Sequence, residues 1–296
     1  MVIVDGVITV DKPQGWTSHD VVNKVRRFAG TKKVGHLGTL DPMATGVLPL
    51  VVGRATRLAK FFTRNEKIYE GTIRFGFATD SYDADGTPLT EPQPVNIAAA
   101  DLETWLNQFR GEFEQTPPPI SAKKVDGKKA YEYARANEPV ELKPVVVTVH
   151  ELTLLGFDGV EAQVRIHCTA GTYVRGIAHD LGQVAGCGAH LSALRRTASG
   201  DFTIDSTHTL DELAVLAAEG RISEALLPAA KLLPDFPAEM VDAITAGRIR
   251  QGREFHVSPF RVRPGSKFVK AISHEGVLVA IGEAKLPNIY HPVLVF

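Results

Sequence analysis

One run of twelve residues limits the possible structure of the chain more than any other: Gly35–Gly46 (GHLGTLDPMATG). Its three glycines predict a loop with sharp turns, or one whose backbone comes close to a ligand. Pro42 holds Asp41 in an extended or turn conformation, because the residue before a proline avoids the helical region. A fixed carboxylate between the apolar Leu40 and Met43 is what a nucleophilic aspartate needs. An isolated Asp-Pro pair more often only starts a turn, so both interpretations stay open on these residues alone.

The composition is that of a folded chain: 44% of its 296 residues are hydrophobic and 23% are charged. This length predicts one large domain with a small one, or two of moderate size. No stretch approaches the roughly 20 apolar residues that span a bilayer, and the start, MVIVDG, lacks the basic segment of a signal peptide. Cys168 and Cys187 are too few for a disulfide framework or a cysteine zinc site. We therefore expect a cytoplasmic protein without membrane association.

The net charge of −1 and the isoelectric point of about 6.8 argue against a nucleic-acid partner when taken alone. The charge is unevenly distributed, however. Residues 1–75 carry twelve Lys and Arg against six Asp and Glu, and residues 76–114 carry eight acids and one Arg. A basic segment beside an acidic one can produce a field that a phosphate backbone feels on one face. A mixed, solvated surface is an equally good interpretation of these charges.

Hydrophobic periodicity predicts a mixed α+β chain. Strands are expected at 7–11 and 67–75, as an antiparallel pair within 145–168, at the start of 171–185, and around 268–272 and 277–281. Helices are expected at 17–28 with Thr17 and Asp20 as a capping box, at 102–109, in the later part of 171–185, at 211–218 and at 238–246. Prolines at 228, 234 and 237 mark a break. We therefore predict a catalytic body at 1–232 and a small β-rich module at 233–296.

The common cofactor motifs are missing from the sequence. It has neither a phosphate-binding loop nor a dinucleotide-binding glycine pattern, and its histidines lack the spacing of a zinc motif. A calcium loop starting at Ser81 would have Pro92 at the twelfth position, where a bidentate Glu is required. The acidic residues Asp83 and Asp85 are therefore predicted to lie in a surface turn. These absences leave a cofactor-free enzyme or a binding module.

The run Gly35–Gly46 closely resembles the catalytic motif of the TruB family of pseudouridine synthases, which convert a specific uridine of tRNA to pseudouridine. Further segments similar to that family's motifs follow in order: DKPQGWTS at 11–18, KIY at 67–69, PPPISAK at 117–123 with AY at 130–131, GTYVR at 171–175, and CGAHL with LRRT at 187–197. The resemblance spans about residues 1–200. It implies an α+β fold: a pseudouridine-synthase catalytic domain with a mixed, largely antiparallel sheet, an RNA-clamping insertion at about 121–145, and a PUA-like C-terminal RNA-binding module. Ile120 departs from the family, which often has an aromatic residue there.

The resemblance also implies roles for single residues. Asp41 matches the catalytic aspartate, Arg175 the arginine that pairs with it, and Tyr69 a tyrosine that stacks on the target base. Leu194 matches the apolar residue on the other side of that base, and His36 a histidine that contacts the opened T-loop. The implied catalytic residues are Asp41, Tyr69 and Arg175, and the implied substrate- and RNA-binding residues are Lys12, His36, Lys123, Lys128, Tyr173 and Leu194.

The resulting prediction is a monomeric enzyme that isomerises uridine at position 55 of the tRNA T-loop by base flipping. It would need no metal, cofactor or protein partner. One alternative is a tRNA-folding module on the same scaffold that opens the T-arm without catalysis. A hydrolase with an aspartate nucleophile would need a second carboxylate, and the motifs contain none. A guide-RNA-directed relative is a nearer competitor, but the chain lacks long basic tails.

Overall fold

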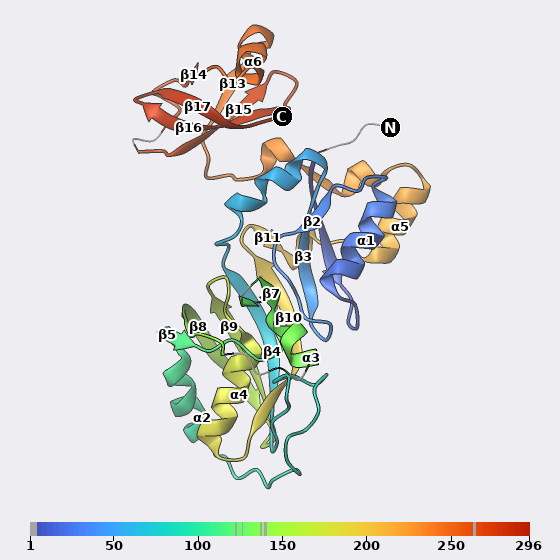
Figure 1. Ribbon diagram of the computed structural model, residues 1–296, viewed down its shortest axis with the longest axis vertical. Helices are drawn as coiled ribbons and strands as arrows, with labels where there is room; N and C mark the ends of the chain where they lie inside the picture. The colour runs from blue at the N-terminus through green and yellow to red at the C-terminus, as the bar shows by residue number, and fades with distance from the viewer. Residues whose placement is uncertain (1–4, 122, 126, 137, 139–140, 263–264) are drawn as a thin grey trace.

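The computed structural model describes residues 5–296 except 122, 126, 137, 139–140 and 263–264, and two sheets dominate it (Figure 1). The large sheet contains β1 (Gly6–Lys12), β2 (Val34–His36), β3 (Thr45–Val52), β4 (Lys67–Phe75), β5 (Gly111–Gln115), β8 (Val145–Phe157), β9 (Glu161–Cys168), β10 (Ala189–Ser199), β11 (Phe202–Thr203) and β12 (Leu226–Pro228). Its helices are α1 (Ser18–Phe28), α2 (Ala99–Leu106), α4 (Val174–Ala185) and α5 (Leu210–Ala218). Short 3₁₀ turns include η1 (Gly53–Phe61) and η2 (Asn107–Phe109).

The large sheet consists of two halves that β10 joins. The strand order is β12-β1-β3-β10-β4-β9-β8-β5, and β10 runs antiparallel to β4 but parallel to β3. The parallel contact is short, pairing Arg195 with Thr45 and Arg196 with Gly46. Because the other pairings of the described strands in this sheet are antiparallel, the sheet is mixed and largely antiparallel, as predicted.

Helices cover the two halves separately (Figure 1). On one half α1 packs on α5 and β2, while on the other α4 packs on α2 and β10. The predicted capping box is present at the start of α1, where Thr17 accepts a hydrogen bond from the Asp20 backbone and the Asp20 carboxylate accepts one from the Thr17 backbone. Val21, Val22 and Val25 then fall on the buried face of α1, as their helical spacing requires.

The small sheet contains β13 (Ala238–Val241), β14 (Phe255–His256), β15 (Phe268–Ser273), β16 (Leu278–Leu286) and β17 (Ile289–Val295), with α6 (Ala243–Arg250). It packs on the large body through η1, because Phe61 lies edge-on to Phe236 and Phe268 at ring-centroid distances of 5.4 and 5.2 Å. Leu278 and Ile281 of β16 also belong to the apolar cluster beneath η1. The small sheet is therefore fixed to the body by aromatic and aliphatic contacts.

Two predicted elements are wrong. Residues 171–173 form no strand, because the chain turns at Gly171, where φ is +94°, and enters α4 at Val174. The helix expected at 238–246 begins at Ala243, after the strand β13. The Asp242 side chain caps α6 by accepting a hydrogen bond from the Thr245 backbone, and β13 pairs in parallel with β15.

The predicted insertion is described only in part. It contains β6 (Lys124–Val125), β7 (Lys128–Lys129) and α3 (Ala130–Arg135), while residues 122, 126, 137 and 139–140 lie outside the described residues. None of the described helices is long and apolar enough to cross a membrane.

The close approach of β10 to β3 makes Gly46 irreplaceable. Gly46 has a φ of +98°, and a Cβ there would lie 2.2 Å from the Arg196 carbonyl oxygen. We expect Gly46→Ala to destabilise the fold by at least about 3 kcal/mol, since left-handed strain alone costs roughly 1–2 kcal/mol. Gly111→Ala is the matched control, because Gly111 has a φ of +81° and open space around its Cβ position. Urea unfolding of both variants measures the difference, and equal losses would contradict a steric role for Gly46.

Candidate active site

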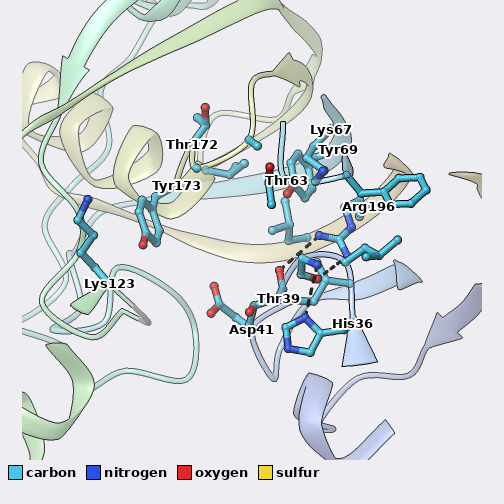
Figure 2. Close-up of a pocket in the computed structure, with 18 of the residues that line it drawn as sticks. His36, Thr39, Asp41, Thr63, Lys67, Tyr69, Lys123, Thr172, Tyr173 and Arg196 are labelled. Atoms are coloured by element: carbon cyan, nitrogen blue, oxygen red, sulfur yellow. Dashed lines mark hydrogen bonds between the residues drawn. The ribbon is translucent and has the colours of Figure 1, made fainter. Parts of the chain in front are cut away.

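A cavity of about 570 Å³ opens at the junction between the two halves of the large sheet. Its walls come from the 36–41 loop, η1, the start of β4, the 170–175 turn and β10. Figure 2 shows Tyr173 and Lys123 on one side of the cavity and Arg196, Lys67 and Tyr69 on the other, with Asp41 between them. The chain therefore gathers at one point residues that are up to 160 positions apart in sequence.

Arg196 holds the loop that carries Asp41. Its side chain is 1% exposed, and it donates hydrogen bonds to the carbonyl oxygens of Val47 at 2.7 Å, Gly38 at 3.1 Å and Thr39 at 3.3 Å. These three acceptors lie on both sides of Asp41 in the chain. A buried guanidinium needs such partners, and here its hydrogen bonds fix the shape of the loop.

Lys12 also holds this loop, through a hydrogen bond to its backbone at Pro42. Its ammonium group donates to the carbonyl oxygens of Pro13, Trp16 and Pro42 at 2.9, 2.6 and 3.1 Å. Burial lowers the pKa of Lys12 to about 8. The side chain is fully buried and does not line the cavity. Lys12 is therefore placed to hold Pro42, the neighbour of Asp41, rather than to contact RNA.

Asp41 faces the guanidinium of Arg175 side-on. Arg175 Nε lies 3.1 Å from Asp41 Oδ2, and Nη2 donates to Oδ1 at 3.3 Å. The Arg175 side chain is 6% exposed, whereas that of Asp41 is 37% exposed. The arginine is therefore buried behind a carboxylate that the cavity can reach. One hydrogen bond from Nη2 and an ion-pair contact at Nε, which makes no hydrogen bond, give a two-point contact that fixes the position and orientation of the carboxylate.

A second carboxylate, Asp83, lies behind Arg175, which corrects the prediction of a surface turn for Asp83, while Asp85 lies in an exposed turn as predicted. Asp83 is 4% exposed, and its Oδ2 lies 3.7 Å from Arg175 Nη1. The same Nη1 donates to the Ser81 carbonyl oxygen at 3.0 Å. Asp83 is buried where the turn meets β10, since Ala84 N donates to the Leu191 carbonyl oxygen, whereas Ala84 and Asp85 are exposed. Asp83 does not line the cavity, so it anchors Arg175 instead of acting on a ligand.

Burial and the charge of Arg175 act on the pKa of Asp41 in opposite directions. Burial raises the pKa of Asp41 above its ordinary value, the Arg175 guanidinium opposes this, and the Asp83 carboxylate adds to the rise. The fold therefore works against the ionised form of Asp41, and Arg175 compensates for part of that cost. A carboxylate with an unfavourable environment near an open cavity is typical of a reactive group.

The side chains of Tyr69 and Leu194 form two apolar surfaces in the cavity wall. In the pairing of β4 with β10, Tyr69 lies opposite Arg196 and Gly71 lies opposite Leu194. A Cβ at Gly71 would approach Leu194 Cδ1 to 3.3 Å, so the glycine leaves room for the leucine. Burial raises the pKa of the Tyr69 hydroxyl, which keeps this phenol neutral. A neutral aromatic ring beside an aliphatic side chain suits a flat, uncharged ligand.

Tyr173 and Lys123 line the opposite wall. Gln115 holds Tyr173 at both ends of its peptide unit, accepting from Tyr173 N at 2.8 Å and donating to the Tyr173 carbonyl oxygen at 2.9 Å. The cation of Arg175 lies 5.9 Å from the Tyr173 ring centre. His36 stands at the rim, where Gly38 N donates to His36 Nδ1 at 3.4 Å.

Four of the six predicted binding residues therefore line the cavity: His36, Lys123, Tyr173 and Leu194. Lys128 does not; its ammonium group lies over the Tyr133 ring on the insertion, 5.6 Å from the ring centre. The lining also offers little to a metal ion, since it includes one carboxylate and one imidazole among the described residues. A protein metal site usually needs at least three such ligands.

Comparison with known proteins assigns the chain to a family. Residues 26–174 match the model of the TruB family pseudouridylate synthase N-terminal domain, and residues 175–234 match that of the tRNA pseudouridylate synthase B C-terminal domain. This chain belongs to the TruB family. It is 63% identical to a tRNA pseudouridine synthase B of Solibacter usitatus, over 99% of this chain and the whole relative. It is 44% identical to that of Thermobifida fusca, over 99% of both chains.

Solved structures agree with this family assignment. A crystal structure of a Cbf5-Nop10-Gar1 complex contains a chain that is 26% identical, with a TM-score of 0.70 over 96% of this chain and 79% of that one. A chain in an H/ACA RNP bound to a substrate RNA has the same fold, with a TM-score of 0.71 at 23% identity, over 98% of this chain and 84% of that one. The predicted fold class, a pseudouridine-synthase domain with a small β-rich C-terminal domain, is confirmed.

The sequence motifs of the family did not reveal two residues that shape this site. Arg196 lies in the LRRT segment, for which the resemblance implies a role only for Leu194, and the sequence predicts a surface turn at Asp83. For Arg196 the sequence does contain a signal. Arg196 follows the apolar Leu194 by two residues in a strand, so both side chains lie on the same face, and a buried guanidinium there needs hydrogen-bond acceptors. For Asp83, the deciding partner Arg175 lies 92 positions away, so no local pattern identifies it.

The raised pKa of Asp41 predicts a stability gain when its charge is removed. A carboxyl whose folded pKa is raised stabilises the fold while it is protonated, and that contribution is lost as pH rises through the folded pKa. Asp41→Asn mimics the protonated form, so we expect it to melt at a higher temperature than wild type at neutral pH. The difference should vanish below the ordinary pKa of Asp.

Asp20→Asn is the matched control of opposite sign. The hydrogen bonds from Thr17 lower the pKa of Asp20, so removing its charge should lower the melting temperature at neutral pH. Thermal unfolding followed by circular dichroism between neutral and acidic pH compares the variants. A lower melting temperature for Asp41→Asn at neutral pH would mean that the Arg175 pair outweighs the burial of Asp41.

Proposed function

We propose that this chain isomerises uridine to pseudouridine in tRNA, at position 55 of the T-loop. The observation that carries the proposal is the Asp41–Arg175 pair, which presents an oriented carboxylate to a cavity walled by Tyr69 and Leu194. The family supplies the reaction, since the relatives are named tRNA pseudouridine synthase B. The site supplies a carboxylate and a paired guanidinium, whose chemistry fits that reaction.

The reaction requires a nucleophile or base and no net redox change. The bond between uracil N1 and ribose C1′ breaks, the base turns, and C5 bonds to C1′; C5 loses a proton and N1 gains one. Asp41 is the carboxylate placed to start this exchange, by adding to the base, by adding to C1′ or by assisting formation of a glycal. Arg175 favours the ionised form of Asp41 and orients it during the reaction, and Asp83 keeps Arg175 in place.

The target uridine must leave the RNA stack to reach Asp41. Flipping a base costs a few kcal/mol of stacking and pairing energy. Stacking on an aromatic side chain returns about 1–3 kcal/mol per base. Tyr69 is placed to stack on one face of the uracil and Leu194 to cover the other. The cavity volume of about 570 Å³ leaves room for one flipped nucleotide.

The rest of the T-arm would lie across the rim of the cavity. His36 stands at that rim, and Lys123 and Tyr173 line the opposite wall. Lys128 extends the basic surface along the insertion. The division into a catalytic domain at 1–232 and an RNA-binding module at 233–296 belongs to the proposal, as do a monomeric state and action without a protein partner. A tRNA substrate also implies a cytoplasmic location.

The first test compares two unmodified tRNA transcripts, one natural and one with the uridine at position 55 replaced by cytidine. We expect one pseudouridine in the first transcript, at position 55, and none in the second, with similar binding of both. Binding of the natural transcript without conversion would leave the non-catalytic tRNA-folding module. Conversion at other positions of the second transcript would overturn the T-loop assignment.

Arg175→Lys separates orientation from charge. Lysine keeps the positive charge but loses the two-point contact with Asp41, and loss of such positioning costs about a hundredfold in turnover. We expect kcat to fall by that amount while tRNA affinity changes little. The matched control is Arg221→Lys, since Arg221 is exposed and pairs with Glu219 and Glu224 far from the cavity. Equal losses of kcat and affinity in Arg175→Lys would contradict the proposed role.

A further inference from the structure

Away from the active site, Glu66, His150 and His167 form a compact cluster of metal-ligating side chains. Glu66 Oε1 lies 3.0 Å from His150 Nε2, and Glu66 Oε2 lies 2.7 Å from His167 Nε2. The three ligand atoms all lie within 4.8 Å of one another. Glu66 directly precedes β4, His150 lies in β8 and His167 in β9, and these three strands are neighbours in the sheet (Figure 1).

A β-bulge explains why the two imidazoles meet. In the pairing of β8 with β9, Val149 lies opposite Cys168 and Glu151 lies opposite His167, so His150 is the extra residue of the bulge. A bulge re-aims a side chain that regular alternation would place elsewhere. The two rings lie 4.9 Å apart between centroids, both turned toward Glu66.

The cluster is open to solvent on the face of the sheet opposite the active-site cavity. Lys67 and Tyr69 line that cavity, whereas Ile68, between them, lines a separate hollow with Glu66 and His167. Side chains alternate between faces along a strand, which accounts for this separation. The three side chains are between 30% and 49% exposed, so an ion and its remaining water ligands can enter.

We propose that Glu66, His150 and His167 form a binding site for a divalent transition-metal ion of the zinc type. Two imidazole nitrogens and one carboxylate are the ligands that Zn²⁺, Co²⁺, Ni²⁺ and Cu²⁺ prefer, while Mg²⁺ and Ca²⁺ prefer oxygen alone. Small side-chain rotations bring the three ligand atoms to the roughly 2.0–2.2 Å that Zn²⁺ requires, and water fills the fourth position. Each imidazole binds through Nε2 and keeps its proton on Nδ1.

A metal ion bound here would link the beginning of β4 to β8 and β9. Glu66 directly precedes Lys67 of β4, and this strand carries Tyr69 into the cavity on the other face. A bound ion would therefore stabilise the end of β4 against β8 and β9 without touching the reacting groups. The site does not depend on the proposed function and would persist if that function were wrong.

The test titrates the metal-free full-length protein with Zn²⁺ in the absence of RNA, by calorimetry. We expect one Zn²⁺ per chain, and affinity reduced at least about tenfold in each of Glu66→Gln, His150→Gln and His167→Gln. The matched control His256→Gln removes an exposed imidazole outside the cluster and should bind like wild type. Excess Mg²⁺ should not compete, because Mg²⁺ prefers oxygen ligands alone.

Thermal unfolding gives an independent readout. Zn²⁺ should raise the melting temperature of wild type and of His256→Gln but not that of the three cluster variants. If the cluster variants bind Zn²⁺ as tightly as wild type, the ion sits elsewhere, for instance at the half-buried Cys187, and the proposal is overturned. The absence of saturable binding would also overturn it and leave the cluster as an ion-pair network only.

Discussion

The hydrogen bonds of Arg196 are the interaction on which the rest of the site depends. At Arg195 and Arg196, β10 pairs with β3 on one side while it stays paired with β4 on the other, which joins the halves of the sheet. The buried guanidinium there has to find acceptors, and it finds them on Val47 and in the loop at Gly38 and Thr39. The same contact that closes the sheet thus gives the loop that carries Asp41 its shape. Gly46 permits that approach because it has no Cβ.

The fold places two carboxylates and one guanidinium close together at the cavity, an arrangement that lowers the stability of the protein. Asp41 and Asp83 contact one guanidinium from two directions, and Arg175 is the cation that both carboxylates share. Burial makes the ionised form of Asp41 unfavourable, so a charged carboxylate at this position costs stability. Natural proteins accept such costs at sites where chemistry requires them. The support is layered: Asp83 and Ser81 hold Arg175, Arg175 holds Asp41, and Lys12 holds the adjacent Pro42.

Much of this could be predicted from the sequence, because some of its signals are local. The capping box at Thr17 and the strand at 67–75 follow from short-range patterns, and the family resemblance singled out Asp41, Tyr69 and Arg175. Features that depend on distant partners could not be predicted. The burial of Asp83 is decided by a backbone contact with β10, and the helix expected at 238–246 starts late because β13 finds a parallel partner in β15. The cluster at Glu66 needs a bulge that no spacing of histidines reveals.

The central claim is that the Asp41 carboxylate performs the chemistry while the rest of the site positions it and the RNA. Single-turnover pseudouridine formation by Asp41→Asn, with tRNA binding measured on the same samples, tests this most directly. The account predicts that binding stays close to wild type and that conversion disappears, because the amide keeps the shape of the side chain and loses its nucleophilicity. Conversion at a rate close to wild type would contradict it and assign the chemistry to another group in the cavity.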